Sequence, residues 1–463
     1  MKKNILPEIV RAWEKEDWFA FEKFIQSPFC LTHQATQQYL RWLKEHLEED
    51  SEQWRELAAA DLNVAPARIY HLQHYAVEAV SRFLAWKTWE STAHQPALQT
   101  IRSLRNLKVS TAVESKLSTA RRKLDADLKR GVHWWRMEYE WRKESFYASK
   151  QQGRANDFNL QGLSEALEIA FVAERLKLAC TQLSHQAITQ KSYSEGLFGA
   201  LLAFIPTSTW LELPLIAGYF HGYWAMKGTQ ESEAHFDALK SILEKSSTEL
   251  DPEEVQDLYL MAINYCIRRF NQNNLVYIQH AFDLYKSGLA CGALLENGVL
   301  SRWTYNNIAL TALHLREYEW GEVFLGQYRR FLSPLHQEGA YHLNMARFKY
   351  ERKVYKEALQ HLLKREHDDP LHNLGAKVLL AKIYWETEEV EALLSQLDSI
   401  DIYLRRQKIM GYHLNYYRAF VKTMKQLVRL KVNDGQQRQR FRTMVLSAAE
   451  LAERSWFLAQ VLE

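Results

Sequence analysis

Between Trp303 and Leu404 one pattern of small and aromatic residues returns three times, and this repeat restricts the fold more than any other feature of the chain. The pattern consists of Tyr305, Ile308, Ala309, Ala312, Tyr318, Gly321, Leu325 and Pro334, then His342, Met345, Ala346, Tyr355, Ala358, Leu362 and Pro370, and last Lys377, Leu380, Ala381, Tyr384, Val390, Leu393 and Leu397. From Ala309 to Ala346 is 37 residues and from Ala346 to Ala381 is 35. A period of this length is typical of paired antiparallel helices stacked in a row.

The small residues have a physical role in this pattern. We expect Ala309, Ala346 and Ala381 where the first helix of each pair presses on the second, because only a small side chain lets two helix axes come within about 8–10 Å. Tyr318 and Tyr355 would fill the space beside that contact. The proline after each second helix would end that helix and turn the chain.

These spacings resemble the tetratricopeptide repeat, in which a small residue is followed by an aromatic, a second small residue and a proline. Ala346, Tyr355, Ala358 and Pro370 of the middle unit all fall in register with that repeat. In the first unit Gly321 replaces the usual alanine and the proline lies one position late, and the third unit lacks both. The resemblance implies a solenoid whose first helices line a concave surface.

Composition agrees with a helical protein. The chain has 463 residues, 47% of them hydrophobic and 25% charged, as in a well-cored protein of two or more domains or one long solenoid. Only 17 glycines and 9 prolines are present, too few for many short strands joined by turns. We therefore predict an all-α protein, with a helical bundle at the N-terminus followed by an α–α solenoid of tetratricopeptide-like helix pairs.

A polar stretch at Gln151–Asn159 reads as a linker, because it contains Gly153, Asn156 and Asp157. It separates an aromatic-rich helical domain at 1–150 from the repeats at 160–404, which are most regular over 303–404. Residues 405–463 form basic helices that would cap the solenoid. We expect two of them, at Tyr403–Leu430 and Phe441–Leu462.

The N-terminal segment from Phe21 to Phe29 has the sequence FEKFIQSPF. It resembles the opening of a family of uncharacterised all-helical bacterial proteins with tetratricopeptide-like C-terminal parts. That resemblance implies a helical fold and carries no known activity. Ser27 and Pro28 would stop a helix here and form a corner with an aromatic core.

Signals for export or membrane insertion are missing from the sequence. Lys2 and Lys3 could begin a signal peptide, but charged residues from Glu8 to Asp17 interrupt the apolar core that would have to follow. No run of about 18 apolar residues occurs, so we expect no membrane-spanning helix. The four cysteines form no CxxC pair and read as buried thiols of a cytoplasmic protein. They are Cys30, Cys180, Cys266 and Cys291.

Two kinds of segment suggest nucleic-acid binding. A hairpin at 54–80 places Ala59, Asn63 and Ile69 at offsets similar to a DNA-binding helix-turn-helix. Its second helix, which would begin at Pro66, offers a single full positive charge, and an ordinary helical hairpin explains the same pattern. The segment 102–130 has nine Lys or Arg against three acids, and 405–442 has eleven against Asp434 alone. Such runs can bind phosphates or an acidic partner, or they can be solvated helix faces.

Catalytic motifs are missing: the sequence has no glycine-rich phosphate loop, no GxSxG elbow and no HExxH. His71 and His74, or the run from His367 to His372, have the spacing of metal ligands, but the run also reads as a turn around Asp369-Pro370. We therefore predict no catalytic residues, no metal, no cofactor and no enzyme activity. A catalytic site assembled from distant helices would leave no such pattern.

The tetratricopeptide resemblance implies six partner-binding residues on the concave surface. They are Asn306, His314, Arg347, Tyr350, Lys382 and Trp385. Because arginine and lysine supply charge and the aromatic rings flat apolar contact, the groove would suit an extended peptide or a helix with an acidic end. We expect an interaction scaffold or adaptor with a protein partner and no membrane association. The alternative is a transcriptional regulator that uses the 54–80 hairpin or a basic segment on nucleic acid.

Overall fold

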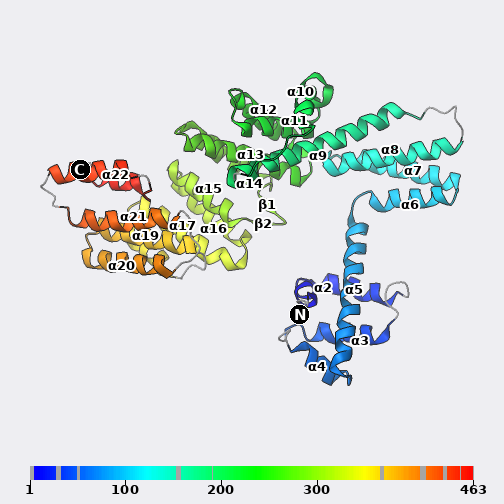
Figure 1. Cartoon of the computed structure of the whole chain (residues 1–463), viewed down its shortest axis with the longest axis horizontal. Helices are drawn as coiled ribbons and strands as arrows, with labels where there is room; N and C mark the ends of the chain where they lie inside the picture. Colours follow the sequence, from blue (N-terminus) through cyan, green and yellow to red (C-terminus); the bar gives the residue numbers. More distant parts are fainter. Residues whose placement is uncertain are drawn as a thin grey trace. The chain divides into compact units, whose positions relative to one another are not determined.

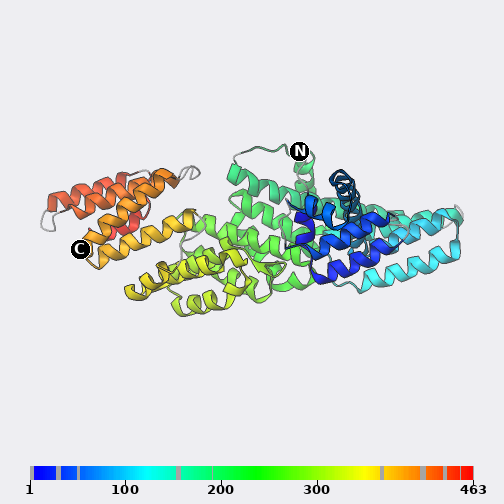
Figure 2. The same cartoon turned by 90° about the horizontal axis from the view of Figure 1, so that it is seen from below.

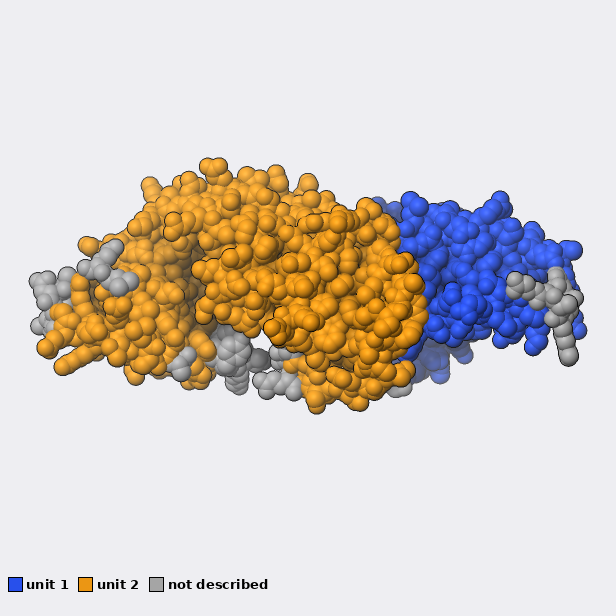
Figure 3. Space-filling view, turned by 90° about the horizontal axis from the view of Figure 1, so that it is seen from above, with its two compact units in different colours: residues 1–174 blue, residues 175–463 orange. Residues whose placement is uncertain are grey.

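The computed structural model describes residues 5–27, 33–48, 53–152, 158–189, 191–364, 370–406, 413–430, 435–448 and 450–461. In these residues the chain is all-α apart from one short β-hairpin, as predicted (Figure 1 and Figure 2). It divides into two compact units, residues 1–174 and 175–463, coloured blue and orange in Figure 3. The division falls inside α9 (Leu160–Thr189). Within the described residues, no helix is long and apolar enough to cross a membrane.

The first unit contains two separate hydrophobic cores. Its helices are α1 (Leu6–Arg11), α2 (Lys15–Gln26), α3 (Gln34–Glu45), α4 (Trp54–Asp61), α5 (Pro66–Ser91), α6 (Gln95–Asn106), α7 (Ser110–Ala126) and α8 (Val132–Gln152). In the core of α1 to α5, the Trp13 ring lies edge-on to Phe21 and Phe83, at centroid distances of 4.9 and 5.4 Å. The other core joins α6, α7 and α8, where the indole N–H groups of Trp134 and Trp141 donate to carbonyls of α7. Helix α8, which carries both tryptophans, therefore packs its aromatic rings in a core.

Buried carboxylates of α8 hold the arginines of α6 and α7. Glu144, 1% exposed, accepts hydrogen bonds from Nε of Arg102 and of Arg105, both at 2.8 Å. Glu138 is equally deep and accepts from Arg121 at 2.5 Å. A buried carboxylate stays ionised only where cations and hydrogen bonds compensate its lost hydration. Three of the nine basic residues at 102–130 are thus neutralised inside the unit.

The second unit consists mostly of helix pairs. Its α-helices are α10 (Phe198–Phe204), α11 (Pro214–Lys227), α12 (Ser232–Ser246), α13 (Pro252–Asn271), α14 (Val276–Ala290), α15 (Arg302–His314), α16 (Tyr318–Tyr328), α17 (Pro334–Glu351), α18 (Tyr355–Leu362), α19 (Pro370–Glu386), α20 (Val390–Arg406), α21 (His413–Val428), α22 (Gly435–Ser447) and α23 (Arg454–Ala459). Short 3-10 helices are η1 (Ile205–Thr207), η2 (Thr209–Glu212), η3 (Ser247–Glu249) and η4 (Arg329–Phe331). From α11 to α20, each odd-numbered helix contacts the even-numbered helix after it. The first helices also contact one another, α15 with α17 and α17 with α19.

The β-hairpin between α14 and α15 was not predicted. Strands β1 (Leu295–Glu296) and β2 (Val299–Leu300) pair antiparallel around Asn297 and Gly298. Both turn residues have positive φ, 51° and 80°, which a two-residue type I′ turn requires. The Asn-Gly pair in the sequence was the available signal for this turn.

The turn inside each of the last three helix pairs has the same geometry. Arg316, Lys353 and Glu388 have φ of 58°, 58° and 62° and follow α15, α17 and α19. The next residue of each turn donates its N–H to a carbonyl five residues earlier, which is the helix-ending Schellman bond. Their spacings, 37 and 35 residues, equal those of the alanines in the sequence repeat. The sequence period is therefore also a period of backbone conformation.

Close packing at Gly321 explains why the first of the three sequence repeats has glycine where the repeat usually has alanine. A Cβ added at Gly321 would overlap the ring of Phe348 and would lie 3.4 Å from Cβ of Ala312. The backbone of α16 therefore touches both α15 and α17 at this position. Phe348 is completely buried, so its ring cannot move into solvent to make room.

Several predictions about the C-terminal half were wrong in detail. Pro334 and Pro370 are the first residues of α17 and α19, where the missing N–H costs no helical hydrogen bond, so they begin helices. The expected pair of terminal helices is replaced by α21, α22 and α23, and α20 extends to Arg406. Hydrophobic periodicity continues across these breaks, because all four helices contribute to one core, and so it did not reveal them.

The described cysteines differ in their burial. Cys180 and Cys266 are buried, and burial raises the pKa of the Cys266 thiol to about 12. Cys291 is exposed, contrary to the prediction of four buried thiols. Cys30, the helix stop at Pro28 and Phe29, the linker residues Gly153, Asn156 and Asp157, and the run 367–369 lie outside the described residues.

Replacing Gly321 by alanine is expected to lower the free energy of unfolding by about 1–3 kcal/mol, because the new methyl group overpacks against Phe348. The control is Gly326→Ala in the same helix, where nothing surrounds the added Cβ. In that variant the free energy of unfolding should rise by up to about 1 kcal/mol, because alanine has a higher helix propensity than glycine. Urea denaturation of both variants measures the difference, and equal effects would show that α16 has room at Gly321.

Replacing Glu144 by glutamine is expected to lower the free energy of unfolding by about 2–3 kcal/mol, because two arginines lose their shared carboxylate. The loss stays below that of a fully buried ion pair because Arg102 is partly exposed. Glu140→Gln is the control. Glu140 is 28% exposed and also pairs with Arg102, so its loss should cost less than about 1 kcal/mol. Denaturation curves that place the two variants together would contradict the structural role of Glu144.

Candidate functional site

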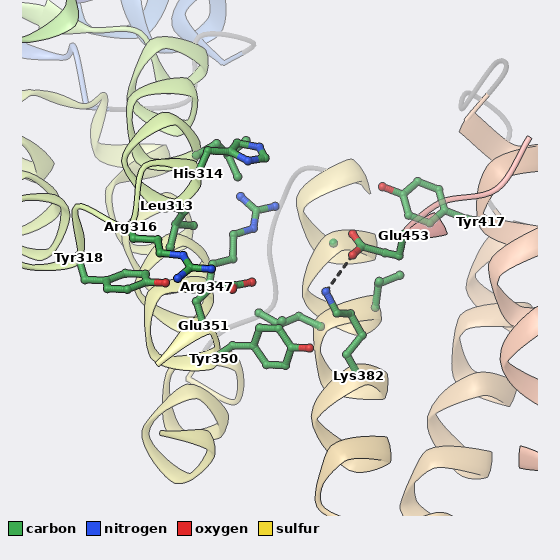
Figure 4. A pocket seen from close by; sticks show the side chains of 14 residues that line it. Leu313, His314, Arg316, Tyr318, Arg347, Tyr350, Glu351, Lys382, Tyr417 and Glu453 are labelled. Atoms are coloured by element: carbon green, nitrogen blue, oxygen red, sulfur yellow. Dashed lines mark hydrogen bonds and ion pairs between the residues drawn. The ribbon is translucent and has the colours of Figure 1, made fainter. Parts of the chain in front are cut away.

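A cavity of about 450 Å³ lies where the first helices of the last three helix pairs meet (Figure 4). α15, α17 and α19 supply most of its wall, and the rest comes from the turn before α16, from α21 and from Glu453 before α23. The lining residues are Leu310, Leu313, His314, Arg316, Tyr318, Arg347, Tyr350, Glu351, Gly375, Val378, Leu379, Lys382, Tyr417 and Glu453.

Four of the six predicted partner-binding residues line this cavity: His314, Arg347, Tyr350 and Lys382. They come from three different helices, and the 37- and 35-residue period places them on corresponding faces. The exposed His314 ring packs edge-on against Phe270 at 5.3 Å. The repeat alignment therefore identified the cavity wall, although it did not indicate the depth of each side chain.

Asn306 is buried and does not line the cavity; it helps to orient the side chain of Arg347 through Asn344. Its Oδ1 accepts a hydrogen bond from Nδ2 of Asn344 at 2.5 Å. Oδ1 of Asn344 in turn accepts from Arg347 at 3.0 Å. This ladder crosses from α15 to α17, and because each member is bonded to the next, it fixes the direction of the guanidinium.

Arg347 is the central charge of the cavity. Its side chain is half-buried, its NH2 lies 3.4 Å from where a Cβ on Gly375 would stand, and it makes no ion pair with any described carboxylate. Burial lowers the pKa of the Arg347 guanidinium, and the negative charge of Glu453 opposes that shift. Since arginine remains protonated in proteins, the shift means that its charge is incompletely solvated. An anion entering the cavity would supply the missing compensation.

Lys382 forms the opposite wall and is already paired. Its Nζ donates to Glu453 at 2.8 Å and lies 4.7 Å from the centre of the Tyr350 ring (Figure 4). Burial, first, and hydrogen bonding to the Glu386 carboxylate raise the pKa of Tyr350. Tyr350 is therefore a neutral donor that presents its ring to the lysine.

Trp385 binds the C-terminal segment of the same chain. Its indole N–H donates to Oε1 of Gln460 at 2.9 Å. One residue further along α19, Glu386 accepts from the indole of Trp456 at 2.7 Å and from Tyr355 at 2.6 Å. The segment around α23 thus covers the part of α19 that the repeat alignment assigned to a partner.

The repeat alignment missed three of the five Lys, Arg or Glu residues that line the cavity: Arg316, Glu351 and Glu453. Arg316 lies two residues after the end of α15, and Glu351, the last residue of α17, lies 37 residues after His314. Tyr417 and Glu453 belong to the C-terminal helices, where no repeat gives a register. The turn period at Arg316 was a usable signal, whereas the cap predicted at 405–463 gave no register to show which of its residues would reach the cavity.

The other predicted segments lack a comparable site. α4 and α5 form the hairpin expected at 54–80, with Pro66 at the start of α5, and Arg68, His71 and His74 are exposed on it. In the described parts of the chain, no group of three or more His, Cys, Asp or Glu residues could hold a metal ion.

Two histidine pairs join helices within the second unit. Nδ1 of His221 on α11 lies 2.8 Å from Nδ1 of His235 on α12, and His342 on α17 meets His361 on α18 at the same distance. A neutral pair forms this bond with one donor and one acceptor, whereas two protonated rings cannot. Burial, and then the nearby His235, lower the pKa of His221 to about 4.

No protein-family model matches the chain, and no curated protein sequence matches it.

The free energy of unfolding is expected to fall as the pH drops from about 6.5 towards 4. The folded protein keeps the His221 ring neutral, so only the unfolded chain takes up the proton, and the stability present above the ordinary histidine pKa is lost. We expect a loss of about 1 kcal/mol at pH 5, since the ring is only half-buried.

His221→Asn should flatten this part of the pH profile, measured by urea denaturation at pH 7 and pH 5. His71→Asn, at an exposed position of α5, is the control and should leave the profile as it is. An unchanged slope in the His221 variant would exclude the pair as its source.

Proposed function

We propose that the chain is an interaction scaffold or adaptor without catalysis of its own, and that residues 302–406 form a tetratricopeptide-like solenoid that binds a peptide or helix. Support for the solenoid comes from the matching periods of small residues and turns, and from direct contacts of α15 with α17 and of α17 with α19. Each first helix then presents the same face, and the cavity is the concave side of the stack.

The observation that carries the proposal is the Arg347 guanidinium. It has one side-chain hydrogen bond, to Asn344, and four further N–H groups that can donate. It stands in a cavity with Leu310, Leu313 and Tyr350 nearby, so charge and flat apolar surface lie together. A peptide with a carboxylate beside an apolar side chain satisfies both, because the guanidinium forms a two-pronged pair with a carboxylate.

The C-terminal segment bounds the site and limits what enters it. Glu453 already pairs with Lys382 at 2.8 Å, which leaves two routes for a ligand carboxylate. In the first route it binds Arg347 and displaces no existing partner. In the second it competes with Glu453 for Lys382. The first route needs no rearrangement of α23, and we assign the ligand carboxylate to Arg347 on that ground. Lys382 then acts through its charge on the far wall.

The regulator alternative is less well supported at two of its three segments, 54–80 and 102–130. In the segment 102–130 the arginines at 102, 105 and 121 are bonded to carboxylates of α8, and the exposed face of the 54–80 hairpin has few cations. We also propose a cytoplasmic location, in keeping with the free thiols of Cys180, Cys266 and Cys291.

Selection of a random peptide library on the full chain is the direct test, and the selected peptides are expected to be enriched in Asp or Glu next to an apolar residue. Arg347→Glu combined with Lys382→Glu should weaken the best peptide at least about tenfold, as for the loss of a charged hydrogen-bonded pair. Isothermal titration calorimetry measures the affinities, and circular dichroism checks folding.

Lys356→Glu, at an exposed position of α18 outside the cavity, is the control and should bind as the unchanged chain does. Selected peptides without acidic residues, or full affinity in the double variant, would overturn the proposal.

A further inference from the structure

A second surface, on helices that follow the repeats, has an unusual charge balance. The described residues 413–430 and 435–448, which contain α21 and α22, have seven Lys or Arg and no Asp or Glu. They are Arg418, Lys422, Lys425, Arg429, Arg438, Arg440 and Arg442. Because these two segments contain no carboxylate side chain, none within them offsets the repulsion among the seven cations.

Four of these cations form a row along α21. Arg418, Lys422 and Lys425 are spaced four and three residues apart, and Arg429 follows four residues later, directly after the helix ends. Residues at these intervals share one face of a helix and, at 1.5 Å per residue, the row is about 16 Å long. The opposite face is buried, with Phe420, so the row faces outwards.

Most of the row is unpaired, in contrast to the arginines of the first unit. The side chains of Arg418, Lys422 and Arg429 are exposed and make no ion pair or hydrogen bond with any described residue. Lys425 alone is bonded, to Asp398 of α20 at 2.7 Å. At Glu144, by comparison, one buried carboxylate holds two arginines. Among the described residues, the other three cations of the row therefore have no protein partner for their charge.

The surface lacks what a protein partner would need. A protein–protein interface is anchored by large apolar or aromatic side chains at its centre. In the described part of α21 no large hydrophobic side chain is exposed, and in α22 Leu446 alone is exposed. A row of cations without apolar anchors fits a ligand whose charges are regular and whose recognition is electrostatic.

We propose that this α21 row binds the phosphate backbone of a nucleic-acid strand without reading its sequence. Along about 16 Å the row would run beside roughly five phosphates of one strand, which are spaced about 3.4 Å apart along a duplex axis. This binding is separate from the peptide cavity, since Arg418, Lys422 and Arg429 do not line it. The scaffold would then hold a peptide on the repeats and a nucleic acid on α21.

The test uses a fluorescein-labelled single-stranded DNA of mixed sequence and the full chain, with anisotropy measured at several salt concentrations. We expect binding at low salt that weakens as salt rises. The combined change Arg418→Gln, Lys422→Gln and Arg429→Gln should weaken it about tenfold or more and reduce the slope of log affinity against log salt by about 2.

A matched variant removes three exposed cations of α7 in the first unit, through Lys116→Gln, Arg122→Gln and Lys123→Gln. It loses the same charge and should bind as the unchanged chain does. No binding at low salt, or equal loss in both variants, would overturn the proposal, because the effect would then be absent or due to net charge alone.

Two further probes separate nucleic acid from other polyanions. Polyglutamate and phosphatidylserine vesicles, at equal total charge, are expected to compete weakly. If either one displaces the DNA as well as unlabelled DNA does, the surface serves an acidic protein or a membrane and the proposal fails. Peptide binding by the cavity is measured separately, so its failure would leave this result intact.

Discussion

Close contact between small residues is the constraint on which the C-terminal half depends. Ala309, Ala346 and Ala381 are completely buried on α15, α17 and α19, and Gly321 brings the backbone of α16 against Phe348. Larger side chains at these points would separate the helices and rotate their outer faces. Because the same contact recurs with the same turn after it, the three first helices present corresponding residues to one cavity.

Arginine has two different roles in this chain, and the carboxylates around it decide which. In the first unit, buried Glu138 and Glu144 collect arginines from α6 and α7, and these cations stabilise the helix packing. Arg347 is instead held by an amide, so its direction is fixed while no described carboxylate forms an ion pair with it. The same residue type can therefore be structural in one place and available to a ligand in another.

The candidate site was predictable where the repeat applied and not elsewhere. Arg347 and Lys382 follow from their offset to Ala346 and Ala381, because equivalent helical positions face the same way. Asn306 precedes its alanine, Ala309, by three residues and is bonded to Asn344 of the neighbouring helix. Trp385 donates to Gln460 of the C-terminal segment. Which residues become buried depends on partners distant in sequence.

Local patterns in the sequence are enough to predict that the chain is all-α, that helices pair with a period near 36, and that positive charge concentrates after the repeats. These properties depend on local spacing, since helix periodicity, small residues and turns act over a few residues to one repeat. Tertiary contacts decide that α23 packs on α19 and that three arginines of the first unit are bonded to buried carboxylates. They also decide that Arg347 and Arg418 make no ion pair with a described carboxylate. Those outcomes depend on which side chains, distant in sequence, come close in space. Coulomb and desolvation energies change steeply with the spatial distance between charged groups.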